Sequence, residues 1–145
     1  MTERIVYPDI EKTLVDYLTA QLDAASDAAK VVTRAPDPRP TRMVRVVRND
    51  RKRRLDREDR EGQRGPNLIL DRPRVVFECT DDAGAAAGLA GLVRAILSGV
   101  APGYLGTVWC DHVEDVGVEN DTDPATAAPR QVIIADLFVR GTVLA

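Results

Sequence analysis

The stretch RQVIIADLFVRGTV, residues 130–143, has the strongest β-strand pattern in the sequence. Its alternate positions from 133 to 139 are all apolar, whereas Asp136 and Arg140 interrupt the opposite set. Because side chains alternate between the two faces of a strand, this pattern gives the strand one wholly apolar face. We therefore predict a strand over this range, with that face turned toward the core.

Four further segments have strand character: 30–34, 41–49, 67–80 and 106–119. Pro73 predicts a break, a bulge or an edge position in the third of them, because proline cannot donate a ladder hydrogen bond. The segment APDPRPT, residues 35–41, has prolines at alternate positions. This favours an extended connection or an edge over a central strand. The composition of residues 120–129 predicts a loop.

Two segments have the apolar spacing of helices. Asp9 is suited to cap the first, which we expect to end at about Ala25. The second is expected to begin after a cap at Asp81 or Asp82 and to stop at Gly99. The apolar positions are Ile10, Leu14, Tyr17, Leu18 and Leu22 in the first helix, and Leu89, Val93, Ile96 and Leu97 in the second.

The second helical segment is rich in small residues, including Gly84, Gly88 and Gly91. Each glycine costs about 1 kcal/mol relative to alanine in a helix interior. We therefore expect these positions to permit close packing, either within the subunit or between subunits. The spacing is also that of membrane-helix dimers, but the segment is too short for a membrane helix and Arg94 interrupts it.

The element order is therefore α-β-β-β-α-β-β. Strands joined by short connections, with one helix at the start and another between strands, indicate an α+β fold. We expect a largely antiparallel sheet with helices packed on one face. A chain of 145 residues corresponds to one domain, 1–145, with a long charged flexible loop at about 49–67.

The composition is that of a soluble globular protein, with 44% hydrophobic and 30% charged residues. No apolar run approaches the roughly 18 residues of a membrane helix, and the N-terminus lacks a signal-peptide pattern. We therefore expect a protein of the cytoplasm with no membrane partner. Cys79 and Cys110 have no partners at metal-ligand spacing, so we expect two buried thiols.

Charge is distributed unevenly along the chain. Residues 45–64 have nine basic and five acidic side chains, a net +4, and the remaining residues have a net −7. Opposite charge blocks can meet across a subunit interface as readily as a basic block can meet DNA. The candidate protein-interaction residues are Arg48, Arg51, Lys52, Arg53, Arg54, Arg57, Arg60 and Arg64. The candidate complementary acidic residues are Glu114, Asp115, Glu119, Asp121 and Asp123.

Three interpretations of the basic stretch NDRKRRLDREDREGQRGPN, residues 49–67, remain open. It is a flexible charged loop, a loop that orders on contact with another protein, or a segment that contacts DNA phosphates. The five interleaved acids and the absence of aromatic residues for base stacking weigh against the third.

The residue types of catalysis and metal binding do not form a recognisable pattern. His112 precedes two acids, but no serine or cysteine nucleophile lies in a known motif, so we expect an ordinary half-exposed strand histidine. Asp121 and Asp123 have the DxD spacing of a calcium loop, but the glycine and the closing glutamate of such a loop are missing. We predict no enzyme activity, no metal and no cofactor.

The order and spacing of the segments resemble those of the tail terminator, or tail completion, proteins of long-tailed siphovirus phages, especially those that infect actinobacteria. The resemblance covers nearly the whole chain. It is carried by these segments: PDIEKTLVDYLTAQL, KVVTRAP, RMVRVVRND, LDRPRVVFECT, AAAGLAGLVRAIL and PRQVIIADLFVRG. Its most specific parts are the D-x-P-x-V motif and the end of the Ala-rich helix, formed by Asp71, Pro73 and Val75, and by Val93, Arg94 and Leu97.

The resemblance implies a structural virion protein that forms a hexameric ring at the head-proximal end of the tail tube. Such a ring stops tube polymerisation and presents a surface for head joining. The implied partners are further copies of this chain, the major tail tube protein and a head–tail connector or stopper protein, with non-specific contact to genomic DNA in the lumen. The implied location is the neck region of the virion tail, after assembly in the host cytoplasm. Two alternatives are another neck component and a nucleic-acid-binding module that uses the Arg-rich loop.

Overall fold

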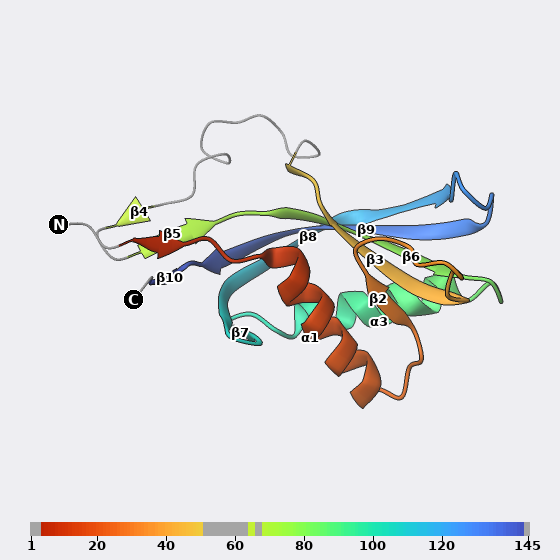
Figure 1. The fold of residues 1–145 in the computed structure, drawn as a ribbon, viewed down its shortest axis with the longest axis horizontal. Helices are drawn as coiled ribbons and strands as arrows, with labels where there is room; N and C mark the ends of the chain where they lie inside the picture. The colour runs from red at the N-terminus through yellow and green to blue at the C-terminus, as the bar shows by residue number, and fades with distance from the viewer. Residues whose placement is uncertain (1–3, 51–63, 66–67, 144–145) are drawn as a thin grey trace.

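The computed structural model describes residues 4–50, 64–65 and 68–143 of the chain. Within this part, two helices pack against a twisted, mostly antiparallel sheet, and Figure 1 shows both helices on the same side of it. The α+β class and the largely antiparallel sheet predicted from the sequence are therefore confirmed.

The central strand of the sheet is β9 (Pro129–Arg140), the segment with the clearest alternation. One side of β9 pairs with β5 (Leu68–Asp71) and β6 (Arg74–Asp81), and the other side pairs with β8 (Val108–Thr122). Beyond β6 come β3 (Arg42–Arg48) and the edge strand β2 (Lys30–Val32), and beyond β8 comes β7 (Gly103–Leu105). All these pairs are antiparallel except β2 with β3.

Pro73 separates β5 from β6, as its position in the sequence predicted. Both strands lie along the same side of β9, and the Leu137 N–H donates to the Pro73 carbonyl across the gap at 3.0 Å. Proline interrupts the ladder because it has no N–H of its own to donate. One long strand is thereby divided without leaving the sheet.

Helix α1 (Ile10–Ala24) begins and ends close to the predicted positions. The Asp9 side chain accepts a hydrogen bond from the Lys12 N–H at 3.2 Å, which satisfies one of the free donors at the helix start. The residues at the helical spacing of four, Ile10, Leu14, Leu18 and Leu22, are all buried. Each such side chain contributes about 1.5–3 kcal/mol by leaving water.

Helix α3 (Ala86–Ser98) begins later than the sequence suggested. Neither Asp81 nor Asp82 caps it, because the Asp81 carboxylate instead accepts from the Ala83 N–H at 2.7 Å and stabilises the preceding turn. The predicted stop at Gly99 is confirmed. The apolar side of α3 packs with α1 and the inner face of the sheet in one core cluster.

The glycines of this region do not pack closely within the subunit. Gly84 precedes α3 with a φ of 82°, a conformation that suits glycine. Gly88 and Gly91 are exposed, and a Cβ added at either would meet nothing within 4 Å. The intrasubunit half of the close-packing prediction is therefore wrong.

Three short strands were not expected from the sequence: β1 (Ile5–Val6), β4 (Arg64–Gly65) and β7. The predicted strand 130–143 is divided at Gly141 into β9 and a short strand, β10 (Thr142–Val143), which pairs with β1. Strand β4 pairs with β5. In addition, β8 extends to Thr122, so the connection to β9 is shorter than the predicted loop.

Candidate functional site

The face of the sheet opposite the helices carries a network of charged side chains. We call it the helix-free face and define it by the residues that alternate with core positions on the central strands. These are Met43, Arg45 and Val47 of β3, Arg74, Val76, Glu78 and Thr80 of β6, and Arg130, Val132, Ile134, Asp136 and Phe138 of β9. The sequence patterns predicted polar interruptions on these strands but not which of them face each other.

A chain of ion pairs crosses four strands of this face. Arg45 Nη1 lies 2.8 Å from Glu78 Oε1, and Arg130 Nη1 lies 3.2 Å from Glu78 Oε2. Arg130 Nε then lies 2.5 Å from Asp121 Oδ1 on β8. Hydrogen bonds between ionised partners are stronger than neutral ones, so this row fixes the register of neighbouring strands as well as balancing charge.

A second row of ion pairs holds the strands together at the start of β6. Arg74 donates to Asp136 through Nε at 2.7 Å and through Nη2 at 2.8 Å, in a two-pronged contact across β6 and β9. Between the two rows lie the buried side chains of Val76, Val132 and Ile134. The face therefore consists of an apolar strip between two rows of paired charges.

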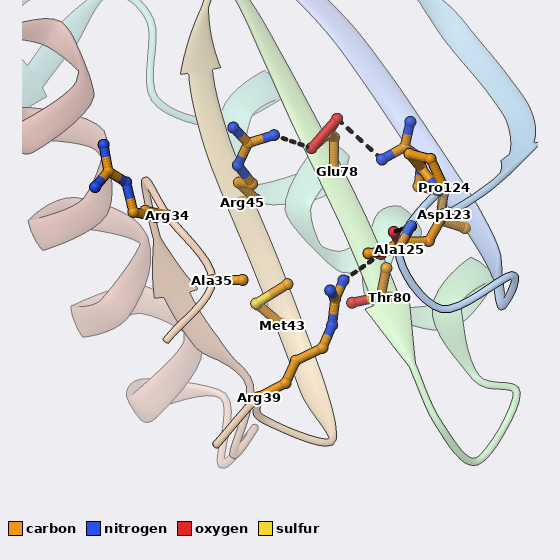
Figure 2. A pocket seen from close by; sticks show the side chains of 11 residues that line it. Arg34, Ala35, Arg39, Met43, Arg45, Glu78, Thr80, Asp123, Pro124 and Ala125 are labelled. Atoms are coloured by element: carbon orange, nitrogen blue, oxygen red, sulfur yellow. Dashed lines mark hydrogen bonds and ion pairs between the residues drawn. The ribbon is translucent and has the colours of Figure 1, made fainter. Parts of the chain in front are cut away.

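The connection after β2 and the β8–β9 turn enclose a pocket of about 290 Å³ on this face. In Figure 2, Arg39 reaches across the pocket to hydrogen-bond with Asp123, and Arg45 points to Glu78. Burial alone would raise the pKa of Asp123, but the Ala125 N–H and the neighbouring guanidinium groups outweigh it and hold that pKa below its usual value.

Three of the four arginines that line this pocket form ion pairs. Arg39, Arg45 and Arg130 each have a carboxylate partner, and Figure 2 shows the Arg34 guanidinium on the side of α1, away from the other side chains. The four arginines of the lining outnumber its two carboxylates, Glu78 and Asp123, so the pocket keeps a net positive charge although most of its arginines are paired. The ion pairs of this pocket link segments that are distant in the sequence.

Residues considered for catalysis or metal binding lie apart. His112 is exposed on β8 with its ring 5.4 Å from that of Phe138. Asp121 and Asp123 pair with two different arginines, so they do not converge on a common point. Among the described residues, no group of three or more His, Cys, Asp or Glu side chains is placed to hold a metal ion.

Both cysteines are buried free thiols, as predicted. Burial raises the pKa of Cys79 to about 12 and also raises the pKa of Cys110. A thiol that stays protonated is a poor nucleophile and a poor metal ligand. In the described part of the chain, no helix is both long and apolar enough to cross a membrane.

The candidate basic residues are only partly described. Arg51, Lys52, Arg53, Arg54, Arg57 and Arg60 lie outside the described residues, and Arg64 is described only as part of β4, paired with Ile69. Arg48, expected to be available to a partner, instead lies 2.8 Å from Asp71 through Nη1 and 3.0 Å from Asp50 through Nη2. It therefore stabilises the subunit and is not part of a free basic surface.

Four of the five candidate acidic residues are exposed, but only Glu114, Glu119 and Asp121 lie on the helix-free face, because Asp115 lies on the side of the helices. Glu114, Asp115, Glu119 and Asp121 are exposed on β8, whereas Asp123 is buried against Arg39. The prediction was therefore wrong for Asp123, because its ion pair joins residues 84 positions apart and could not be seen in the local pattern. Asp115 pairs with Arg94 at 2.8 Å, and Asp121 with Arg130.

Glu114 and Glu119 have no ion-pair partner within the described part of the chain. They lie on the margin of the sheet, because β7 pairs only with residues 108–110 of β8 and leaves the edge of 111–122 unpaired among the described strands. The opposite margin is β2, where exposed Lys30 and Arg34 also lack a described ion-pair partner. These two cations were not among the sequence candidates, since a charge pattern alone does not identify a strand as an edge.

Compared with protein-family models and with curated proteins, the sequence matches none.

Proposed function

We propose that this chain is a structural virion protein, a tail terminator that forms a ring, with six copies as the expected number, at the head-proximal end of a phage tail tube. The ring ends tube polymerisation and presents the surface for joining the head. Its partners are further copies of the chain, the major tail tube protein and a connector or stopper protein.

One observation carries this proposal: among the described residues, β8 and β2 give the sheet unlike edges at opposite margins. The β8 edge is long and acidic, and the β2 edge is short and flanked by cations. A closed ring needs heterologous contacts, in which two different surfaces of each copy meet. A subunit with unlike edges on its two sides supplies such surfaces, whereas two-fold dimers need one self-complementary surface.

The chemistry of the described residues supports a structural role. Three of the four arginines that line the pocket of the helix-free face are paired with carboxylates, and both thiols are buried. We further propose that the basic stretch of residues 49–67 contacts the tail tube or a neighbouring copy. Any DNA contact would be with the genome that passes through the ring.

Inactivation of the gene in the phage genome that encodes this chain tests the proposal. We expect tails of uncontrolled length and filled heads without tails, with both defects restored by the wild-type gene. Gold-labelled antibody against the chain should bind the head-proximal end of tails made without heads. Tails of normal length and full infectivity would refute the proposal, and label on isolated heads would identify a connector instead.

A charge reversal at Arg51, Lys52, Arg53 and Arg54 tests the role of the basic stretch. The variant should keep the circular dichroism spectrum of the wild type but fail to complement the inactivated gene. Normal yields of infectious particles from this variant would show that the stretch is not a required contact.

A further inference from the structure

We infer that the sheet continues from one copy of the chain to the next, with the β2 edge of one copy pairing with the β8 edge of its neighbour. This inference rests on the proposed function, because it names the two surfaces through which the ring would form. The β8 edge of residues 111–122 and the β2 edge both lack a strand neighbour among the described residues. Unpaired backbone N–H and C=O groups of an edge are ready to accept another strand.

The strand directions determine how the two edges would meet. Because β3, β6, β9 and β8 are successively antiparallel, β8 runs opposite to β3. Strand β2 runs parallel to β3, so it also runs opposite to β8. If neighbouring copies keep their helices on the same side of a continuous sheet, β8 of one copy meets β2 of the next in the antiparallel sense.

The charges without described partners have opposite sign across this junction. Glu114 and Glu119 are five residues apart in the sequence, but they lie opposite Asp136 and Val132 of β9, which are four residues apart. The difference arises because the bulge near Val116 adds one residue to β8. Lys30 begins β2, and Arg34 follows two residues after its end, in a bend. Antiparallel pairing that brings Lys30 to Glu119 also carries the bend after β2, and Arg34 with it, toward the Glu114 end of this edge.

The exposed apolar residues of β8 lie between these carboxylates. Val116 is 45% exposed and Val118 is 36% exposed. A strand placed against this edge would cover them, and Lys30 would lie on the same face as Glu119, since its partner Met43 belongs to the helix-free face. Backbone hydrogen bonds and valine burial would then supply affinity, while the two charge pairs would supply register.

Disulfide trapping tests the pairing directly. Residues opposite each other in an antiparallel pair have Cα atoms about 4.5–5.5 Å apart, within the range of a disulfide. We expect Lys30→Cys and Glu119→Cys chains to form a heterodimer when mixed and mildly oxidised. A chain that carries both substitutions should give a ladder of covalent oligomers on denaturing gels, even where association in solution is weak. Cys79 and Cys110 are buried and should not contribute.

Cysteines at two exposed positions away from the inferred junction, Asp23→Cys and Asp82→Cys, provide the matched control and should give no ladder. Absence of the Lys30–Glu119 heterodimer would overturn the inference. Glu119→Cys homodimers as the main product would overturn it too, because they would indicate an isologous contact.

A charge exchange provides the second test. The Glu114→Lys/Glu119→Lys variant turns two attractions into two repulsions, which at the usual strength of exposed ion pairs weakens self-association about 30-fold. Sedimentation equilibrium should show this loss, and mixing with a Lys30→Glu/Arg34→Glu chain should restore association between the two variants. Asp23→Lys/Asp82→Lys makes the same change in net charge and should leave association unaltered.

The edge pairing and the proposed function can fail separately. A Lys30–Glu119 ladder from a chain whose loss leaves tails normal would support the edge pairing and refute the tail function. Tails of uncontrolled length on gene loss, together with full complementation by the Glu114→Lys/Glu119→Lys variant and no ladder, would support the tail function and overturn the edge pairing.

Discussion

Replacement of Gly88 and Gly91 by alanine should make the folded subunit more stable. Both glycines lie within α3, and a methyl group added at either position would meet nothing within 4 Å. Glycine in a helix interior costs about 1 kcal/mol relative to alanine, chiefly because the unfolded chain loses more freedom on folding. The double variant should therefore gain about 2 kcal/mol in the free energy of unfolding.

Thermal and urea unfolding measure this gain. For a chain of this size, 1 kcal/mol corresponds to about 3 °C in Tm, so the double variant should melt about 6 °C higher. Gly103→Ala is the opposite control, because its Cβ would lie 2.4 Å from the Val100 carbonyl oxygen. That substitution should lower the Tm. An unchanged or lower Tm for the Gly88→Ala/Gly91→Ala variant would refute the argument that this side of α3 is unobstructed.

The same double variant tests the remaining half of the small-residue hypothesis, that Gly88 and Gly91 permit close packing between subunits. The β2–β8 pairing does not use the outer side of α3, so self-association should be unchanged by the two methyl groups. Loss of association in a variant of raised Tm would show instead that this helix packs against a neighbouring copy.

Two other predictions follow from the electrostatics. Hydrogen bonds from Arg42 hold the pKa of Asp27 and of Asp81 below the usual 3.8. The stability that such carboxylates contribute is fully present above pH 3.8, and it is lost as the pH falls through their lowered folded-state pKa values. Arg42→Met removes this contribution, so the free energy of unfolding of the variant should fall less steeply with decreasing pH in the acid range. An equally steep loss of stability at acid pH in the variant would contradict the attribution of the lowered pKa values to Arg42. Burial raises the pKa of Cys79 to about 12, so an aromatic disulfide reagent should modify this thiol only after urea unfolds the chain. Rapid modification of Cys79 in the native protein would contradict its burial.

The elements that could be predicted from sequence are those whose pattern is local. In α1, Asp9 and the apolar residues at intervals of four settle the start, the end and the buried side within one short segment. In β9, alternation identifies both the strand and its inner face. The break at Pro73 was predictable for the same reason, since the missing N–H belongs to a single residue.

What the sequence could not determine depends on distant partners. The strands β1, β4 and β7 have only two or three residues each, too few for a periodic pattern, and they form because other segments pair with them. Asp81 is a residue type that often caps helices, but its carboxylate instead accepts hydrogen bonds from Arg42 and from the Ala83 N–H in the turn before α3. The position of β2 at the sheet margin likewise follows from its pairing with β3 and not from its own residues.

The distribution of charge along the sequence suggested that whole basic and acidic blocks meet between subunits. In the folded chain much of that charge is balanced internally: Arg48 pairs with Asp71, Arg39 with Asp123, and Glu78 bridges Arg45 and Arg130. The charges left without described partners at the sheet margins are few, and they lie at opposite edges with opposite sign.

Exposed ion pairs contribute little individually, so these residual charges cannot by themselves hold a ring together. Their effect depends on the strand edges beside them, whose backbone groups can supply affinity while the charges select the register. A test by high salt alone would therefore be a poor guide to the interface. The trapping of Lys30 against Glu119 is more decisive, because it reports which two residues meet.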